Sequence, residues 1–151
     1  MTIELAKSKD KQKIAMLDTH ISALLLDECI RKCHIYVLKD NSIKNGSRNH
    51  CPEDTVVGVL RYSLFWQTIP FLDLLYIDEA YRNQGFGTAM MHQWEKEMAT
   101  CGYKYVMTST QSDEKAWRFY EKLGYRKTGG FFPPEQEAEE WMYLKRLEPQ
   151  E

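Results

Sequence analysis

A short glycine-containing segment constrains this chain most, because of what stands on either side of it. The segment reads RNQGFGT (residues 82–88) and follows an apolar run, Phe71–Ile77, that predicts a buried strand. After it, apolar residues recur at helical spacing to about Thr100. Glycines let a backbone turn sharply, and the first amides of a helix have no acceptor within the helix. The junction is therefore a candidate cradle for a phosphate, unless Gly85 and Gly87 serve only the turn.

Two other kinds of phosphate loop fit this segment less well. A dinucleotide fingerprint requires a third glycine where Met90 stands, and an acidic residue at the end of the next strand. The next predicted strand, residues 104–110, contains no acidic residue. A nucleoside-triphosphate loop requires Gly-Lys followed by Ser or Thr, which this segment lacks. The predicted ligand carries phosphate but is bound in neither of those ways.

The size and charge of the chain limit which classes of protein it can belong to. Its 151 residues suit one domain, and its acidic and basic residues are interspersed, with a net charge of −2. This balance is not typical of a nucleic-acid-binding surface. No apolar run could span a membrane, and the N-terminus lacks the basic-then-apolar order of a signal peptide. We expect a single domain over residues 1–151 in the cytoplasm, with no nucleic-acid or membrane partner.

The four cysteines are predicted to be reduced, because the chain shows no export signal. They are Cys29, Cys33, Cys51 and Cys101. Two of them, four residues apart, could form a metal site with His34, His50 and Cys51, but the spacing matches no familiar zinc pattern. We therefore expect buried thiols and no metal.

The remaining periodicities predict an order of strands and helices. Strands are expected over residues 2–6, 34–38, 55–66, 71–77, 104–110, 125–128 and 141–145. A first helical segment is expected over residues 10–33, bent or broken at residues 23–26. A second helix is expected from the glycine segment to about residue 100, and a third over residues 114–123, capped by Ser112 or Asp113. Long loops are expected over residues 39–54 and 129–134. This order predicts one mixed α/β domain.

Two motifs together resemble those of a known family. Arg82-x-x-Gly85-x-Gly87 after a strand resembles the acyl-CoA signature of the GNAT superfamily of N-acetyltransferases. The segment AWRFYEKLGY (residues 116–125) resembles that family's closing motif. The close match covers residues 71–128, and the element order extends it over nearly the whole chain. The resemblance implies a central, mostly antiparallel twisted sheet of six to seven strands, flanked by about four helices.

The resemblance also implies how acetyl-CoA would bind. In the family, the strand before the loop pairs with the pantetheine arm through its backbone, which maps to Leu75, Tyr76 and Ile77. The loop that holds the pyrophosphate maps to Arg82, Asn83, Gln84, Gly85, Phe86, Gly87 and Thr88. Many members carry Asn near the pantetheine where this chain has Asp113, which cannot donate when ionised. Ser112, or else Ser109 or Thr110, is expected to supply that contact instead.

Two residues are predicted to act in catalysis. In the family, the tyrosine of the closing motif often protonates the leaving thiolate, and it maps to Tyr120. The acceptor amine must lose a proton before it attacks, and a carboxylate can take this proton directly or through water. Asp73 stands in the apolar strand, where burial would make it a better base. The alternative is that Asp73 only bonds a neighbouring backbone group or Arg61.

The resemblance implies transfer of the acetyl group of acetyl-CoA to a primary amine of a small molecule or peptide, by direct attack in a ternary complex. A non-catalytic acyl-CoA-binding sensor or scaffold is the alternative. A homodimer is a further expectation, because relatives often pair. The sequence does not identify the acceptor. The candidate lining of its pocket, which could equally be core, is Leu26, Tyr62, Phe65, Trp66, Phe131 and Phe132.

Overall fold

The structure is a computed structural model that describes residues 1–42 and 55–149. Its α-helices are α1 (Lys11–Leu17), α2 (Ala23–Arg31), α3 (Phe86–Thr100) and α4 (Ala116–Lys122). Its strands are β1 (Thr2–Leu5), β2 (Ile35–Asp40), β3 (Thr55–Phe65), β4 (Ile69–Ile77), β5 (Tyr105–Gln111), β6 (Arg126–Phe131) and β7 (Glu140–Arg146). Short 3-10 helices span Ser8–Asp10 and Glu79–Tyr81.

The seven strands of the described residues form one sheet in the order β1-β2-β3-β4-β5-β7-β6. The β4–β5 pair is parallel, whereas the β1–β2, β2–β3, β5–β7 and β6–β7 pairs are antiparallel. The predicted fold class, a mixed α/β fold with a mostly antiparallel sheet and about four helices, is confirmed. The chain forms two compact units, residues 1–61 with 74–91 and residues 62–73 with 92–151, and β3, β4 and α3 contribute to both.

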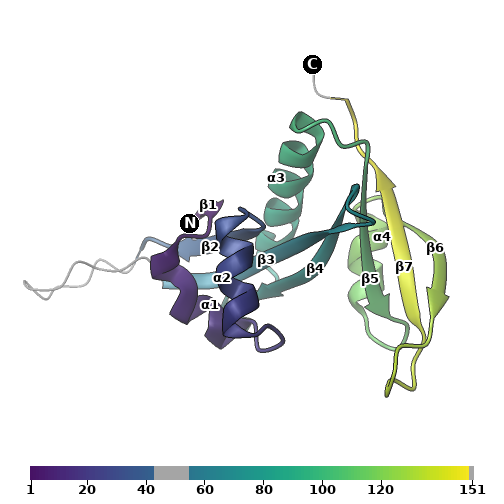
Figure 1. The fold of residues 1–151 in the computed structure, drawn as a ribbon, viewed down its shortest axis with the longest axis horizontal. Coiled ribbons are helices and arrows are strands. Elements are labelled where there is room, and N and C mark those ends of the chain that lie inside the picture. Colours follow the sequence, from purple (N-terminus) through teal and green to yellow (C-terminus); the bar gives the residue numbers. More distant parts are fainter. Residues whose placement is uncertain (43–54, 150–151) are drawn as a thin grey trace, which may run out of the picture. The chain divides into compact units, whose positions relative to one another are not determined.

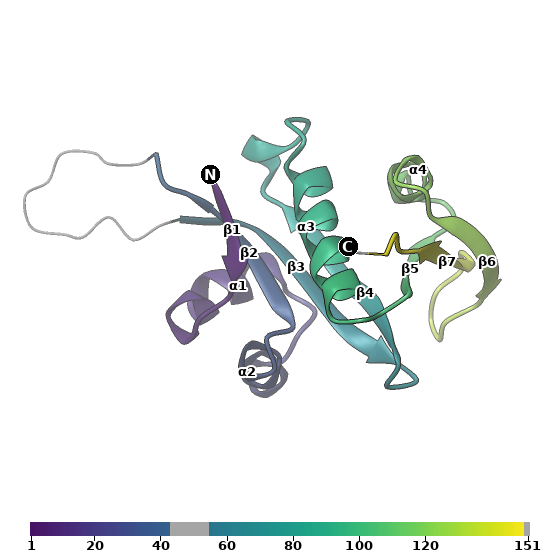
Figure 2. The ribbon, with the colours of Figure 1, turned by 90° about the horizontal axis from the view of Figure 1, so that it is seen from above.

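The first unit packs α1 and α2 against strands of the sheet (Figure 2). Ile14 of α1 and Leu26 of α2 share a buried apolar cluster with Ile35 and Val37 of β2. The two helices are separate, as the sequence allowed, but the break precedes Ala23 rather than lying within residues 23–26. The Ser22 side chain accepts a hydrogen bond from the Leu25 amide and so begins α2.

The second unit is built on β5, β7 and β6, which lie side by side (Figure 1). Trp94 of α3 is fully buried, and its ring centroid lies 5.6 Å from that of Tyr62. The carboxylate of Glu95 accepts hydrogen bonds from the Tyr125 hydroxyl at 2.9 Å and from Lys145 at 2.6 Å. These contacts fix the second half of α3 within this unit.

Several boundaries differ from the sequence prediction, and three of the differences concern the expected caps and loops. Helix α4 begins at Ala116, and its N-cap is Lys115 rather than Ser112 or Asp113. A turn precedes it, in which the Glu114 amide donates to the Gln111 carbonyl at 3.2 Å. Strand β6 continues through Gly129–Phe131, where a loop was expected, because these residues pair with β7. Lys39 and Asp40 belong to β2, while residues 43–54 of the expected 39–54 loop lie outside the described residues.

Candidate functional site

The glycine segment makes the predicted turn from β4 into α3. Gly85 has φ +82°, a conformation that favours glycine, and a Cβ built on it would meet no atom within 4 Å. The Ala89 amide donates to the Gly85 carbonyl at 3.0 Å and closes the first helical turn. The amides of Phe86, Gly87 and Thr88 therefore stand in that turn, where no helical carbonyl can accept from them. Together they form a positively polarised, open helix end that suits an anion.

The side chain of Arg82 contacts the end of β4. Its Nε donates to the Ile77 carbonyl at 2.7 Å, and its guanidinium carbon lies 5.2 Å from the centre of the Tyr76 ring. A guanidinium carries five N–H donors, and the Ile77 bond uses one of them. Because the side chain is exposed, its other donors can bind a phosphate. The strand end and the loop, which the sequence predicted to share one ligand, are thus linked through Arg82.

Tyr81 anchors the residues just before the loop. Its hydroxyl donates to the Asp40 carboxylate at 2.6 Å. The Ser42 hydroxyl and amide also donate to Asp40, at 2.6 Å and 2.9 Å. Hydrogen bonds from the Ser42 and Tyr81 side chains and from the Ser42 backbone lower the pKa of Asp40 to about 2. Asp40 is therefore ionised at neutral pH and holds the start of the loop.

Tyr120 is buried in the second unit. Its ring makes edge-on contacts with Phe119 and Tyr125, with centroids at 5.2 Å and 5.7 Å. Burial raises the pKa of Tyr120 to about 12, and a hydrogen bond with the Thr108 side chain acts in the opposite direction. The phenol is therefore protonated at neutral pH and can donate, as the catalytic prediction requires.

Asp73 lies in a different environment from the one predicted. The sequence suggested burial, but Asp73 is exposed and lines a pocket of about 400 Å³ in the second unit. The reason is the alternation of β4: Leu72 points into the core, so Asp73 points to the opposite face of the sheet. Arg61, the partner considered for Asp73, donates from Nε to the buried Asp18 at 2.7 Å. The catalytic role of Asp73 remains a prediction.

The candidate acceptor lining divides into two groups. Leu26 and Tyr62 are core residues, 1% and 7% exposed. Phe65, Trp66 and Phe131 line the same pocket as Asp73, together with Ser63, Leu64, Phe71, Ser109 and Met142. Phe132 follows Phe131 in the sequence and is exposed, but it does not line this pocket. The aromatic residues nearest the β3–β4 hairpin therefore form a pocket rather than core.

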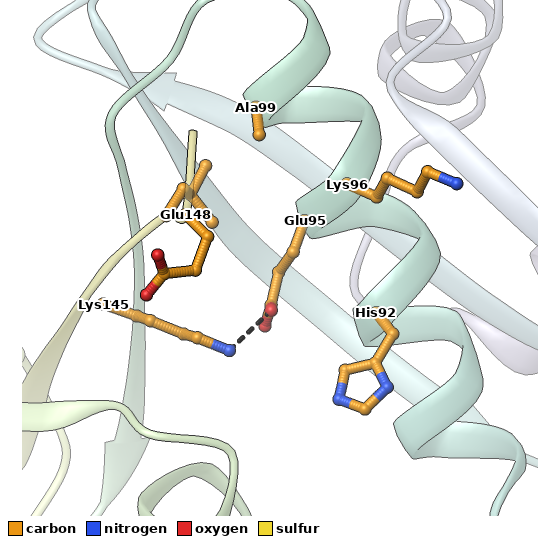
Figure 3. Close-up of a pocket in the computed structure, with 7 residues that line it drawn as sticks. His92, Glu95, Lys96, Ala99, Lys145 and Glu148 are labelled. Atoms are coloured by element: carbon orange, nitrogen blue, oxygen red, sulfur yellow. Dashed lines mark hydrogen bonds and ion pairs between the residues drawn. The ribbon is translucent and has the colours of Figure 1, made fainter. Parts of the chain in front are cut away.

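A smaller pocket of about 250 Å³ lies between α3 and β7 (Figure 3). Lys145 and Glu95 point toward one another across it and form the 2.6 Å ion pair, while Lys96 points away from them. Glu95 is 7% exposed and accepts from Tyr125 as well, so its charge is already compensated. This arrangement is a buried structural network, and we assign no ligand to it.

Sequence reasoning missed Thr108 and Asp40. Thr108 is buried on β5, where its hydroxyl donates to the Leu72 carbonyl at 3.2 Å and interacts with Tyr120. The alternation of side chains along a strand could have indicated that Thr108 and Ser109 lie on opposite faces of the sheet. Asp40 stood in a predicted loop, and nothing in the sequence linked it to Tyr81.

No group of three or more His, Cys, Asp or Glu side chains within residues 1–42 and 55–149 is arranged to hold a metal. His50 and Cys51, two of the residues weighed for such a site, lie outside these ranges.

None of the helices in the described part of the chain is long and apolar enough to cross a membrane.

Comparisons with known proteins agree with this geometry. The model of the Acetyltransferase (GNAT) family matches residues 20–125. The fold is similar to that of Ard1 from Thermoplasma volcanium, with a TM-score of 0.78, 19% identity and 97% coverage of both chains. It is also similar to the aminoglycoside 6'-N-acetyltransferase from Enterococcus faecium, with a TM-score of 0.77, 18% identity, and coverage of 100% of this chain and 99% of that one.

A third similar structure is the ribosomal-protein-S18-alanine N-acetyltransferase from Escherichia coli, with a TM-score of 0.76, 13% identity, and coverage of 99% of this chain and 96% of that one. A sequence comparison with curated proteins found no significant match. At these identities the solved structures establish the fold. The family match spans more than half of the 151 residues and includes the Arg82–Thr88 segment. This chain belongs to the acetyltransferase (GNAT) family.

Proposed function

We propose that this protein transfers the acetyl group of acetyl-CoA to a primary amine by direct attack in a ternary complex. The observation that carries the proposal is the left-handed turn at Gly85 immediately before α3, because it opens a helix end to an anionic ligand. Two similar structures are described as bound to CoA, one being the NatC complex with Gag peptide and CoA and the other an aminoglycoside 6'-N-acetyltransferase with coenzyme A.

The segment from Arg82 to Thr88 is proposed to bind the phosphates of acetyl-CoA. The first-turn amides of α3 donate to phosphate oxygens, and the exposed guanidinium of Arg82 adds charge. The backbone of Leu75, Tyr76 and Ile77 is proposed to pair with the amides of the pantetheine arm. The Ser112 hydroxyl is proposed to contact that arm too, since its amide is occupied by Glu139 but its side chain is not needed for the cap of α4.

Asp73 is proposed to receive the proton that the acceptor amine gives up. The amine nitrogen then forms a bond to the acetyl carbon, and the bond between that carbon and sulfur breaks. An ammonium thus loses two protons in all: Asp73 or water takes the first before the attack, and the second leaves the nitrogen as the amide forms and balances the proton that the sulfur gains. The products are an amide and a free thiol. Because Asp73 is exposed, water can relay the proton between the amine and bulk solvent.

Tyr120 is proposed to stabilise the leaving sulfur by donating a hydrogen bond. A free thiol has a pKa of about 8.5, which is below the value of about 12 to which burial raises the pKa of Tyr120. Complete transfer of the phenolic proton to the thiolate is therefore uphill, while a hydrogen bond to the developing negative charge is favourable. The second proton released by the nitrogen, as the amide forms, balances the one that the thiol takes up.

The proposal is tested by thiol release from acetyl-CoA with a panel of primary amines, with mass spectrometry to detect the acetylated product. Amine-dependent thiol release with a mass increase of one acetyl group is the expected result. Saturable acetyl-CoA binding without turnover on any amine would instead favour the sensor or scaffold. Tyr120→Phe separates the two further, because only an enzyme loses rate in this variant while its acetyl-CoA binding is unchanged.

A further inference from the structure

The side chains that line the Asp73 pocket indicate which kind of acceptor amine it could bind. It lies wholly within the second unit and has a volume of about 400 Å³, which is in the range of pockets for small organic molecules. Four of its lining side chains are aromatic: Phe65, Trp66, Phe71 and Phe131. Three of these form a continuous series, since the ring centroids of Phe65 and Trp66 are 4.8 Å apart and those of Phe65 and Phe71 are 6.1 Å apart.

Trp66 occupies an unusual place for a large aromatic residue. It stands at the tip of the β3–β4 hairpin with φ +53°, and Gln67 beside it has φ +59°. The Thr68 amide donates to the Phe65 carbonyl at 3.0 Å and closes this tight turn. Turns with two left-handed central residues favour Asn and Gly, and bulky residues there are strained. The turn therefore does not explain the presence of tryptophan.

Packing does not explain Trp66 either. The residue is 79% exposed, and Phe131, which lines the same pocket, is 51% exposed. Large exposed aromatic residues that gather at one hollow are typical of a binding surface. The strain of the turn and the exposure of the ring thus indicate that Trp66 serves a ligand rather than the fold.

The pocket also contains one carboxylate and two hydroxyl groups. Asp73 is the one charged residue among the described residues that line it, and Ser63 and Ser109 supply hydroxyls. A carboxylate has about four acceptor positions, so Asp73 can accept from an ammonium beside any other partner. A polycationic acceptor would require several acidic groups, and this lining supplies one. The pocket therefore matches a single ammonium attached to a flat or apolar body.

We propose that the acceptor is a small primary monoamine with an aromatic body, whose ring stacks on Trp66 and whose amine lies toward Asp73. This inference rests on the proposed function and narrows its substrate class. An aromatic face attracts both a stacked ring and a nearby cation, so Trp66 and Phe131 can hold such a molecule without further hydrogen bonds. Trp66 is then a specificity-determining residue.

The test compares steady-state acetylation of 2-phenylethylamine, n-butylamine, spermidine, kanamycin and a peptide with N-terminal phenylalanine. The value of kcat/KM for 2-phenylethylamine is expected to exceed that for every other amine by about tenfold. The substitution Trp66→Asn removes the ring but suits the left-handed turn, so the hairpin is retained. In this variant KM for 2-phenylethylamine should rise about fivefold to tenfold, with kcat and acetyl-CoA affinity unchanged.

Phe132→Ala is the matched control, because Phe132 is 66% exposed, adjacent to Phe131 and outside the pocket lining. Its KM should equal that of the wild type. An unchanged KM in Trp66→Asn, or a preference for spermidine, kanamycin or the peptide, would overturn the inference.

A calorimetric titration with 2-phenylethylamine in the absence of acetyl-CoA separates this inference from the proposed function. Binding that Trp66→Asn weakens fivefold or more supports the aromatic pocket even if no amine is acetylated. Equal binding by both proteins, or none by either, overturns the pocket assignment even if other amines are acetylated.

Discussion

The hydroxyl of Tyr81 donates a 2.6 Å hydrogen bond to Asp40, which joins β2 to the residue immediately before the Arg82–Thr88 loop. Hydrogen bonds from Ser42 and Tyr81 lower the pKa of Asp40 to about 2, so this contact is charge-assisted at neutral pH. The loop is therefore held at the residue that precedes it, Tyr81, as well as at its first residue, through the Arg82 bond to Ile77. These two anchors are expected to keep the amides of α3 in position for the proposed phosphate ligand.

Removing the Tyr81 hydroxyl should weaken acetyl-CoA binding. In Tyr81→Phe the loop loses one anchor, and we expect the Kd for acetyl-CoA to rise about threefold to tenfold, because a charge-assisted hydrogen bond contributes roughly 1 kcal/mol or more. Calorimetric titration measures the change. Tyr105→Phe, which removes an exposed hydroxyl from β5, should leave the Kd unchanged. Equal Kd values in Tyr81→Phe and wild type would show that the anchor does not position the loop.

Gly85→Ala should harm ligand binding beyond its effect on stability. Gly85 has φ +82°, so alanine there costs roughly 1 kcal/mol of folding free energy through the backbone alone, and its methyl group would occupy the open space in front of α3. We expect acetyl-CoA affinity to fall at least tenfold.

Gly102→Ala is the matched control at the other end of α3, because Gly102 has φ +96° and no atom within 4 Å of a built Cβ. It should lose similar stability in urea unfolding and keep wild-type affinity. Equal losses of affinity in both variants would mean that Gly85 acts only through the fold.

Tyr120→Phe should lower the rate without changing acetyl-CoA binding. The phenol is buried and protonated, so Tyr120→Phe removes the proposed donor to the leaving sulfur but little packing. General acid groups typically contribute about 100-fold or more, and a hydrogen-bond donor somewhat less, so we expect a decrease in kcat of about 10- to 100-fold. Initial rates of thiol release at saturating acetyl-CoA measure this decrease in kcat. Wild-type kcat with every amine would remove Tyr120 from the mechanism.

The same phenol should make folding sensitive to alkaline pH. Burial raises the pKa of Tyr120 from 10 to about 12, so its contribution to stability is fully present below pH 10 and is lost between pH 10 and 12. Between pH 8 and pH 11 the wild type should therefore lose about 1 kcal/mol more unfolding free energy than Tyr120→Phe. Urea titrations at the two pH values measure this difference. Identical losses would contradict the burial of an ionisable phenol at this position.

Breaking the Glu95–Lys145 ion pair should destabilise the second unit. Glu95 is 7% exposed, so Lys145→Met leaves a nearly buried carboxylate with only the Tyr125 hydroxyl as a described side-chain donor. We expect a loss of about 2–3 kcal/mol in unfolding free energy. Lys96→Met is the control, because Lys96 is exposed and points away from Glu95 (Figure 3). A loss in Lys145→Met no larger than in the control would show that the pair is weak.

The sequence predicted the fold where local chemistry and pattern agree. The apolar run of residues 71–77, the two glycines that follow it and the helical periodicity to about residue 100 all indicate one strand–turn–helix unit, and the structure contains it. The two GNAT-like motifs supplied the order of the surrounding elements. Gly124 also ends α4 as expected, with φ +93°.

The errors arose where distant contacts decide the local structure. Ser112 was expected to cap α4, but α4 begins only at Ala116, and the Ser112 amide bonds Glu139, which is remote in sequence. Gly129 and Gly130 indicated a loop, yet their pairing with β7 extends β6 through them. Asp73 stood in an apolar strand and so suggested burial. Which face of that strand is covered depends on the whole sheet, and no pattern within β4 reveals it.

Calorimetric titration of the purified protein with acetyl-CoA, with ATP and NAD as controls, tests most directly whether the Arg82–Thr88 loop binds the phosphates of acetyl-CoA. We expect saturable binding of acetyl-CoA at one site per chain, at least tenfold weaker in Gly85→Ala than in Gly102→Ala, with no comparable binding of ATP or NAD. Absence of acetyl-CoA binding, or binding equal in the two glycine variants, would contradict the assignment of the Arg82–Thr88 loop as its phosphate site.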